Sequence, residues 1–184
     1  EQFDQMSSQL KHVKPKEIQD IKQRLKEEKG QGGAYYCSLP SFRDSYRLVT
    51  RMLERSGQSA YLMLCSLTDG KGHPLEKPEK LELLSEELQN TIQHCLRKGD
   101  SFTKYSPSQY LVLLIGTNKE NCGLIFDRIR KYFSREHRSW NKYVEFYVSS
   151  VAEVDNLDTP IQFRNDDCGW MRWKSMMMLQ CAVV

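Results

Sequence analysis

The stretch that most constrains the fold of this chain is Arg97–Ile115, RKGDSFTKYSPSQYLVLLI. Its pattern predicts a helix end capped near Gly99, a short strand rich in aromatic and β-branched residues, a Ser-Pro-Ser-Gln turn, and a second strand that is almost wholly apolar. These features together predict a β-hairpin. Because the second arm, Tyr110–Ile115, shows no polar alternation, we expect both of its faces to be covered and the strand to lie centrally in a sheet.

The composition is that of an ordinary globular protein, with 184 residues, 28% charged and 39% hydrophobic. This length gives room for one domain and an extension. No apolar run approaches the roughly 20 residues of a membrane helix, and no signal peptide opens the chain, so we expect a cytoplasmic protein with no membrane partner. The chain begins at Glu1 and not at Met, so we expect a piece of a longer protein whose upstream domains are partners of this one.

Charge and cysteine usage argue against two further classes of function. The net charge of +3 is too small and too mixed to predict direct contact with nucleic acid, and a basic cluster between Arg128 and Lys142 is interpreted as a solvated helix end. The six cysteines form no C-x-x-C pair and fall mostly at apolar positions, which predicts reduced core residues. The four histidines are scattered without metal-ligand spacing, so we expect no metal site.

Periodicity and capping signals divide the chain into a helical linker, residues 1–33, and one domain, residues 34–184. The linker contains a helix over 16–29, interpreted as solvated, with a dimer-forming helix as the alternative. Within the domain we predict helices and strands over the following ranges: helix 41–56, capped by Ser41 and Asp44 and ended by Gly57; strand 59–67; helix from 78 or 79 to 97; helix 118–134, with Thr117 and Glu120 as a capping box; strand 143–151. For the helix over 41–56 we predict a buried face of Phe42, Tyr46, Val49, Met52 and Leu53. The tail 152–184, with Trp170, Trp173, Met176, Met177 and Met178, could be a strand, a helix or a partner surface, and we favour a docked terminal element.

The hairpin resembles that of the diguanylate cyclase (GGDEF) family. Ser106-Pro107-Ser108-Gln109-Tyr110 stands where that family writes Gly-Gly-Asp/Glu-Glu-Phe, and an R-x-x-D motif, Arg97 and Asp100, precedes it by five residues. The resemblance extends over about 59–151. It implies an α+β, ferredoxin-related nucleotide-cyclase-like fold, with an antiparallel or mixed central sheet flanked by helices and an N-terminal helical linker. The motif is also similar to modules that end some bacterial transcriptional regulators.

The same positions depart from the family in their chemistry. Pro107 replaces a glycine, which removes an N–H group and fixes φ, and Gln109 stands where a carboxylate would bind metal. At the end of the first strand the family has an Asp that binds two Mg²⁺ ions, whereas Ser66–Thr68 offers none. Asp69 is nearby, but a shift along a strand turns a side chain to the other face, so we interpret it as a turn residue. We therefore predict that the domain has no catalytic residues and no metal or cofactor, and is not an enzyme.

Arg97 and Asp100 match the family's inhibitory site, which implies that cyclic di-GMP is a regulatory ligand. In the family the Arg contacts a guanine and a phosphate, and the Asp accepts from the guanine edge; planar guanidinium donors suit that task. The alternative is that Arg97 complements the helix C-terminus and Asp100 caps a turn.

The sequence thus supports one hypothesis of function and two alternatives. The first is an inactive cyclase-like regulatory domain that dimerises with a second copy of itself or senses a ligand. The second is a protein-interaction module with no small ligand. The third is an active nucleotide cyclase with relocated metal ligands, Asp69 and Glu145.

Overall fold

The structure is a computed structural model that describes residues 18–26, 32–75, 77–152 and 161–163. The described residues belong to two compact units, one within residues 1–31 and one within 32–184, and each is described by itself. The first unit contains helix α2 (Ile18–Leu25), on which Ile18 and Leu25 are exposed. Part of the predicted linker helix over 16–29 is therefore helical in the structure. Its two predicted ends lie outside the described residues.

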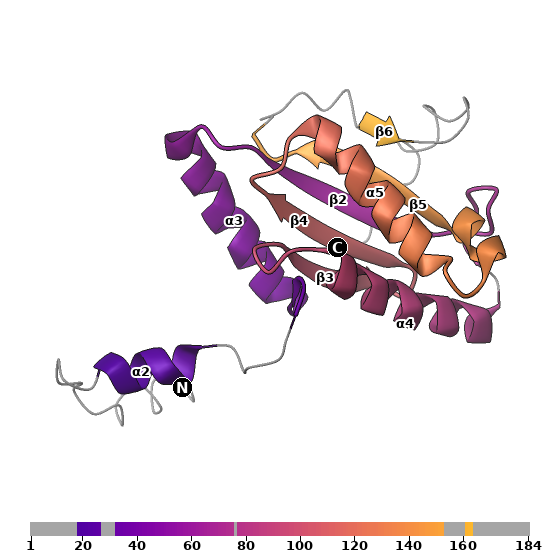
Figure 1. Cartoon of the computed structure of the whole chain (residues 1–184), viewed down its shortest axis with the longest axis horizontal. Helices are drawn as coiled ribbons and strands as arrows, with labels where there is room; N and C mark the ends of the chain where they lie inside the picture. The colour runs from indigo at the N-terminus through magenta and orange to yellow at the C-terminus, as the bar shows by residue number, and fades with distance from the viewer. Residues whose placement is uncertain (1–17, 27–31, 76, 153–160, 164–184) are drawn as a thin grey trace, which may run out of the picture. The chain divides into compact units, whose positions relative to one another are not determined.

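The second unit is built on a six-stranded sheet in the order β1-β3-β4-β2-β5-β6 (Figure 1). Its strands are β1 (Tyr35–Tyr36), β2 (Ala60–Leu67), β3 (Ser101–Ser106), β4 (Gln109–Ile115), β5 (Val144–Ser150) and β6 (Ile161–Phe163). Strand β1 pairs with β3 in parallel, and every other neighbouring pair is antiparallel. The predicted mixed α+β arrangement is confirmed.

The hairpin is the one that the sequence predicts. Strands β3 and β4 are joined by a tight turn at Pro107 and Ser108, and β4 lies between β3 and β2. Both faces of β4 are covered, because Val112 and Leu114 pack in one hydrophobic cluster and Leu113 packs in another. This is the alternation expected of a central strand whose successive side chains point to opposite faces.

Helices cover the two faces of the sheet. Helices α4 (Pro78–Cys95) and α5 (Lys119–Phe133) contact each other and bury Leu84, Leu88 and Ile92 of α4 and Phe126, Ile129 and Phe133 of α5 in the larger cluster (Figure 1). Helix α3 (Leu39–Ser56) contributes Phe42, Val49 and Leu53 to the smaller cluster on the other face. A 3₁₀ helix, η2 (Arg138–Tyr143), leads into β5. No helix among the described residues is long and apolar enough to cross a membrane.

The start of helix α3 corrects one sequence prediction. The helix begins at Leu39, and its cap is Ser38, whose Oγ accepts a hydrogen bond from the Ser41 N–H at 3.4 Å. The prediction that Ser41 and Asp44 cap it was wrong, because Pro40 fits the first turn of a helix and lets it begin earlier. Gly57 ends the helix as predicted, with φ of 64°. Met52, predicted to be buried, is exposed.

Two other helix ends also differ from the sequence prediction. Helix α4 ends at Cys95, with Leu96 as an extended cap, so the prediction of an end at Arg97 capped near Gly99 was wrong. The chain turns there because the Asp100 N–H donates to the Arg97 carbonyl at 3.0 Å. Helix α5 is capped by Asn118, whose side chain accepts from the Asn121 N–H at 2.9 Å, and not by the predicted pair of Thr117 and Glu120.

The cysteines within the described residues are core residues, as predicted. Cys37, Cys65, Cys95 and Cys122 are free and buried, and burial raises the pKa of the Cys65 thiol. Cys168 and Cys181 lie outside the described residues, as do Trp170, Trp173 and the methionines of the tail.

Candidate functional site

The candidate site lies where strand β2 ends and its two neighbours, β4 and β5, begin. Cross-strand register places Ser66 of β2 directly beside Gln109 of β4 on one side and Glu145 of β5 on the other. Neighbours in register share one face of a sheet. This is the junction at which the resemblance to cyclases predicts an acidic pair.

Two neutral side chains fill the centre of this junction. Ser66 is 6% exposed and Gln109 is 5% exposed, and the Gln109 Nε2 donates to the Ser66 Oγ at 3.4 Å. On its other side the Gln109 Oε1 accepts from the Ser106 Oγ at 3.3 Å. The amide of Gln109 is therefore held as a bridge between the hairpin tip and strand β2. Neither side chain offers a charged oxygen, which is the ligand that Mg²⁺ prefers.

A backbone hydrogen bond joins the hairpin tip to strand β2. The Ser108 carbonyl accepts from the Leu67 N–H at 2.8 Å, and the Ser108 N–H donates to the Ser106 Oγ at 3.4 Å. Pro107 has no N–H group to offer a ligand and restricts φ. The tip is thus a compact turn closed by its own hydroxyl groups.

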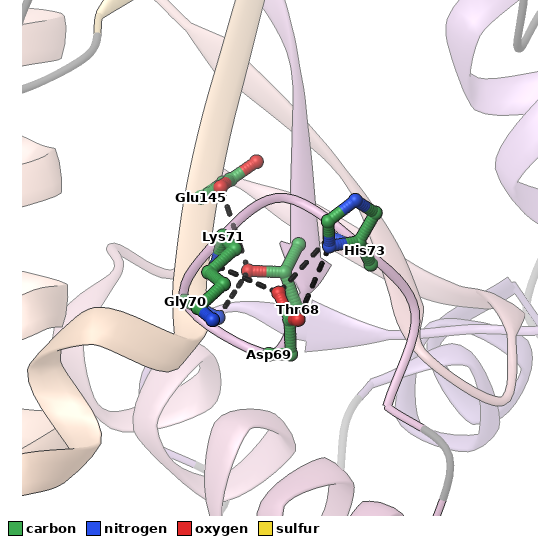
Figure 2. A network of polar contacts seen from close by, with 6 residues as sticks. All are labelled: Thr68, Asp69, Gly70, Lys71, His73 and Glu145. Carbon is green, nitrogen blue, oxygen red and sulfur yellow. Dashed lines mark hydrogen bonds and ion pairs between the residues drawn. The ribbon is translucent and has the colours of Figure 1, made fainter.

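The loop after β2 holds Asp69 as a turn residue, as the sequence predicts (Figure 2). Its carboxylate accepts from the N–H of Lys71 at 2.7 Å and from that of His73 at 3.1 Å, and it lies 3.2 Å from the His73 Nδ1. The hydrogen bond from the Lys71 N–H is the largest cause that lowers the pKa of Asp69. Asp69 is ionised at neutral pH and closes its own loop.

Glu145 has partners different from those of Asp69 (Figure 2). Its carboxylate accepts from the Thr68 Oγ1 at 3.4 Å and from the Tyr147 hydroxyl at 2.8 Å, while the same Thr68 Oγ1 accepts from the Gly70 N–H at 3.3 Å. Within the described residues no group of three or more His, Cys, Asp or Glu side chains is placed to hold a metal ion. The hydroxyl of Thr68 therefore connects Glu145 to the loop.

The structure places Arg97 and Asp100 at the exit of helix α4. Arg97 is exposed, whereas Asp100 is 4% exposed. The Asp100 Oδ2 accepts from the Arg97 N–H at 3.1 Å, and its Oδ1 accepts from the Ile115 N–H at 3.2 Å. Asp100 therefore caps its own turn and joins that turn to the end of β4. Binding of cyclic di-GMP at these two residues stays a prediction.

We expect Asp100 to give the free energy of unfolding a measurable pH dependence. Burial is the largest influence on its carboxyl and raises its pKa above the ordinary 3.8, while the two N–H donors and Arg97 oppose that rise. A raised pKa stabilises the folded state fully below the ordinary value, and this contribution is lost as pH rises through the folded value. Urea titrations give the unfolding free energies of wild type and of Asp100→Asn. The value for wild type minus the value for the variant should fall from pH 3 to pH 7, with a slope no steeper than that of about one titrating group. A rise of this difference with pH would contradict the assignment.

Tyr110, at the position where the cyclase motif has Phe, joins the hairpin to helix α4. Its side chain is fully buried, and its hydroxyl donates to the Ser85 carbonyl at 3.0 Å, with the Ser85 Oγ at 2.9 Å and the Gln89 Oε1 at 3.3 Å. We expect Tyr110→Phe to lower the unfolding free energy by about 1–2 kcal/mol, because the buried Ser85 loses the hydroxyl as its hydrogen-bond partner. The exposed Tyr105→Phe in β3 is the control, and equal stability of the two variants would contradict this role.

Sequence reasoning did not find several of these contacts. It missed strand β1, the Ser66–Gln109 hydrogen bond, and the Thr68–Glu145 link, because all three depend on pairing between distant segments. A signal was present for Ser66 and Gln109, since two polar residues end strands that are otherwise apolar.

Comparison with known proteins shows which fold the chain has. No family model matches the sequence, and no curated protein matches it. Among solved structures, a DGC protein from Thermotoga maritima is similar with a TM-score of 0.51 and 16% identity, over 84% of this chain and 98% of that one. The GGDEF domain of DgcB from Caulobacter crescentus, solved in complex with c-di-GMP, is similar with a TM-score of 0.51 and 12% identity, over 68% of this chain and 80% of that one. The chain therefore has a GGDEF-like fold, the fold of diguanylate cyclase domains.

Proposed function

We propose that this chain is a catalytically inactive GGDEF-like domain with a regulatory role. The observation that carries the proposal is the buried, hydrogen-bonded pair of Ser66 and Gln109 at the junction where the cyclase resemblance requires metal ligands. Two Mg²⁺ ions on a triphosphate need several carboxylate oxygens, and a serine and an amide supply no charge to balance them. Asp69 and Glu145, the two carboxylates considered as relocated metal ligands, are engaged in separate hydrogen bonds.

Incubation with GTP and Mg²⁺ tests the absence of catalysis. We expect no cyclic di-GMP by mass spectrometry under conditions in which an active diguanylate cyclase, run in parallel, converts its substrate. The same assay should include Asp69→Asn and Glu145→Gln. If wild type turns over and either variant does not, the relocated-ligand hypothesis is correct and this proposal is wrong.

Cyclic di-GMP is the regulatory ligand that we propose to test first. Arg97 is exposed, and its guanidinium suits phosphate and guanine. Asp100 is already committed to two backbone N–H groups, so a guanine reaches its carboxylate only if the turn opens. Isothermal titration of wild type and Arg97→Ala with cyclic di-GMP measures this directly. Heat from wild type that Arg97→Ala abolishes supports the ligand-sensing role, and no heat from wild type excludes it.

The burial of Asp100 favours a second candidate, a protein-interaction module with no small ligand. In that role the domain acts by forming a homodimer or by contacting other domains of its host. We propose a bacterial transcriptional regulator in the cytoplasm as that host, on the sequence resemblance of the hairpin. Analytical ultracentrifugation with and without cyclic di-GMP distinguishes the candidates: a dimer that ignores the ligand supports the interaction module, and a ligand-dependent dimer supports sensing.

A further inference from the structure

Helix α3 carries a row of arginines on the side turned away from the sheet. Arg43, Arg47, Arg51 and Arg55 recur at every fourth residue, and all four are exposed. Four residues advance a helix by about 6 Å, so the row extends over about 18 Å. The opposite side of the helix is the buried one, where Phe42, Val49 and Leu53 pack on the sheet. The helix is therefore held in place by its buried side, and the arginine row lies on its exposed side.

The arginine row is only partly balanced by acids on the same helix. Asp44 lies 3.7 Å from the Arg47 guanidinium with both side chains largely exposed, and Glu54 is the other exposed acid of α3. An exposed ion pair of this length is weak and leaves the guanidinium accessible. Four arginines against two acids make the surface attractive to anions. They also make it repel a second copy of itself, so this row is not a self-complementary dimer surface.

Two exposed apolar side chains flank the row and narrow the choice of partner. Leu48 is 61% exposed and Met52 is 56% exposed, and one helical turn separates them. The sugar-phosphate backbone of a nucleic acid would pair with the arginines and leave both apolar side chains in water. An anionic lipid surface accepts both, since guanidinium groups bind headgroup phosphates in a bidentate manner and apolar side chains enter the boundary with the acyl chains.

We propose that this face of α3, namely Arg43, Arg47, Leu48, Arg51, Met52 and Arg55, docks the domain on the surface of an anionic phospholipid membrane. The contact is peripheral and adds no membrane-spanning segment. It departs from the expectation of no membrane partner, which the absence of a long apolar run suggested. The proposal is independent of the proposed function, because none of these residues belongs to the junction of β2, β4 and β5 or to the turn at Arg97.

Vesicle co-sedimentation with the full chain tests the proposal. We expect binding to vesicles of phosphatidylcholine with about one third phosphatidylglycerol, none to phosphatidylcholine alone, and weakening by salt. One arginine near such a surface contributes about fivefold to the partition coefficient, so Arg47→Gln/Arg51→Gln should lower it about 25-fold. Leu48→Ser/Met52→Ser should lower it about fivefold or more without changing the charge.

The matched control removes the same charge elsewhere. Lys131→Gln/Arg138→Gln alters two exposed cations of α5 and η2 and should bind vesicles within about twofold of wild type. Equal loss in this control and in the arginine variant would show attraction by net charge alone and would overturn the proposal. Absence of binding to the anionic vesicles would also overturn it, as would binding of a short single-stranded DNA or an acidic peptide through the same arginines in its place. Circular dichroism of each variant confirms that the fold is retained.

Discussion

Replacing Gly33 by alanine is expected to lower the free energy of unfolding of the GGDEF-like domain by about 3 kcal/mol or more. Gly33 has φ of 82°, and an added Cβ would overlap the carbonyl oxygen of Gln93 at the end of helix α4. The same oxygen accepts from the Ala34 N–H at 3.1 Å, so the backbone cannot withdraw without losing that hydrogen bond. The substitution should release strand β1. The Tyr35 N–H donates to the carbonyl of Asp100, just before β3, and the Cys37 N–H donates to the carbonyl of Phe102 in β3.

A second glycine separates backbone strain from the clash at Gly33. Gly57 also has a positive φ, 64°, but a Cβ there would meet nothing within 4 Å. Gly57→Ala should therefore lower the free energy of unfolding by only about 1–2 kcal/mol, which is the cost of the left-handed conformation for a residue with a Cβ. Urea denaturation gives both values, and hydrogen exchange at Tyr35 and Cys37 should become faster in the Gly33 variant only. Equal costs at the two glycines would contradict the close approach of Gly33 to Gln93.

The double substitution Ser66→Asp/Gln109→Glu is expected to destabilise the domain by about 3 kcal/mol at neutral pH without metal. It places two carboxylates in neighbouring buried positions, where burial and the charge of each carboxylate oppose ionisation of the other. The loss should grow as pH rises above the ordinary carboxyl range. If the cyclase frame is otherwise intact, Mg²⁺ restores stability by binding only the folded variant, by about 2.7 kcal/mol at a concentration 100 times its Kd.

Thermal unfolding with and without Mg²⁺ measures both parts of this prediction. Ser66→Asn, with Gln109 unchanged, adds the same volume as the acidic variant and carries no charge, so it isolates the cost of fitting larger side chains. Wild type and the Asn variant should not respond to Mg²⁺. An acidic variant that is destabilised but indifferent to Mg²⁺ would show that the frame differs from that of a cyclase in more than these two side chains. We expect no cyclase activity from this variant, since Pro107 still restricts the backbone at the hairpin tip.

The local features of this fold could be predicted from the sequence because their signals lie within a few residues of one another. The run Tyr110–Ile115 predicted a central strand, since only a strand covered on both faces tolerates such continuous apolarity. Gly57 predicted the end of helix α3, and Thr68-Asp69-Gly70 predicted the turn in which Asp69 accepts from the next N–H groups. Chain propensity and short-range hydrogen bonding are sufficient for such features.

Other outcomes depended on contacts that no local pattern contains. Helix α4 ends at Cys95 and not at Arg97 because the Asp100 carboxylate accepts from Arg97 and from Ile115, fifteen residues later. Met52 is exposed although its spacing suits the buried face, because α3 rests on the sheet along the line of Phe42, Val49 and Leu53. The short strand β1 exists only because β3 offers it a free edge.

By itself, then, the sequence determined the hairpin, the central strand and the replacement of acidic by neutral side chains at the motif. Only the tertiary structure decided that Ser66, Gln109 and Glu145 come together, and that the first two bond to each other while the third bonds to Thr68 and Tyr147. The physical reason is register: which residues face each other across three strands depends on how segments far apart in the chain pair.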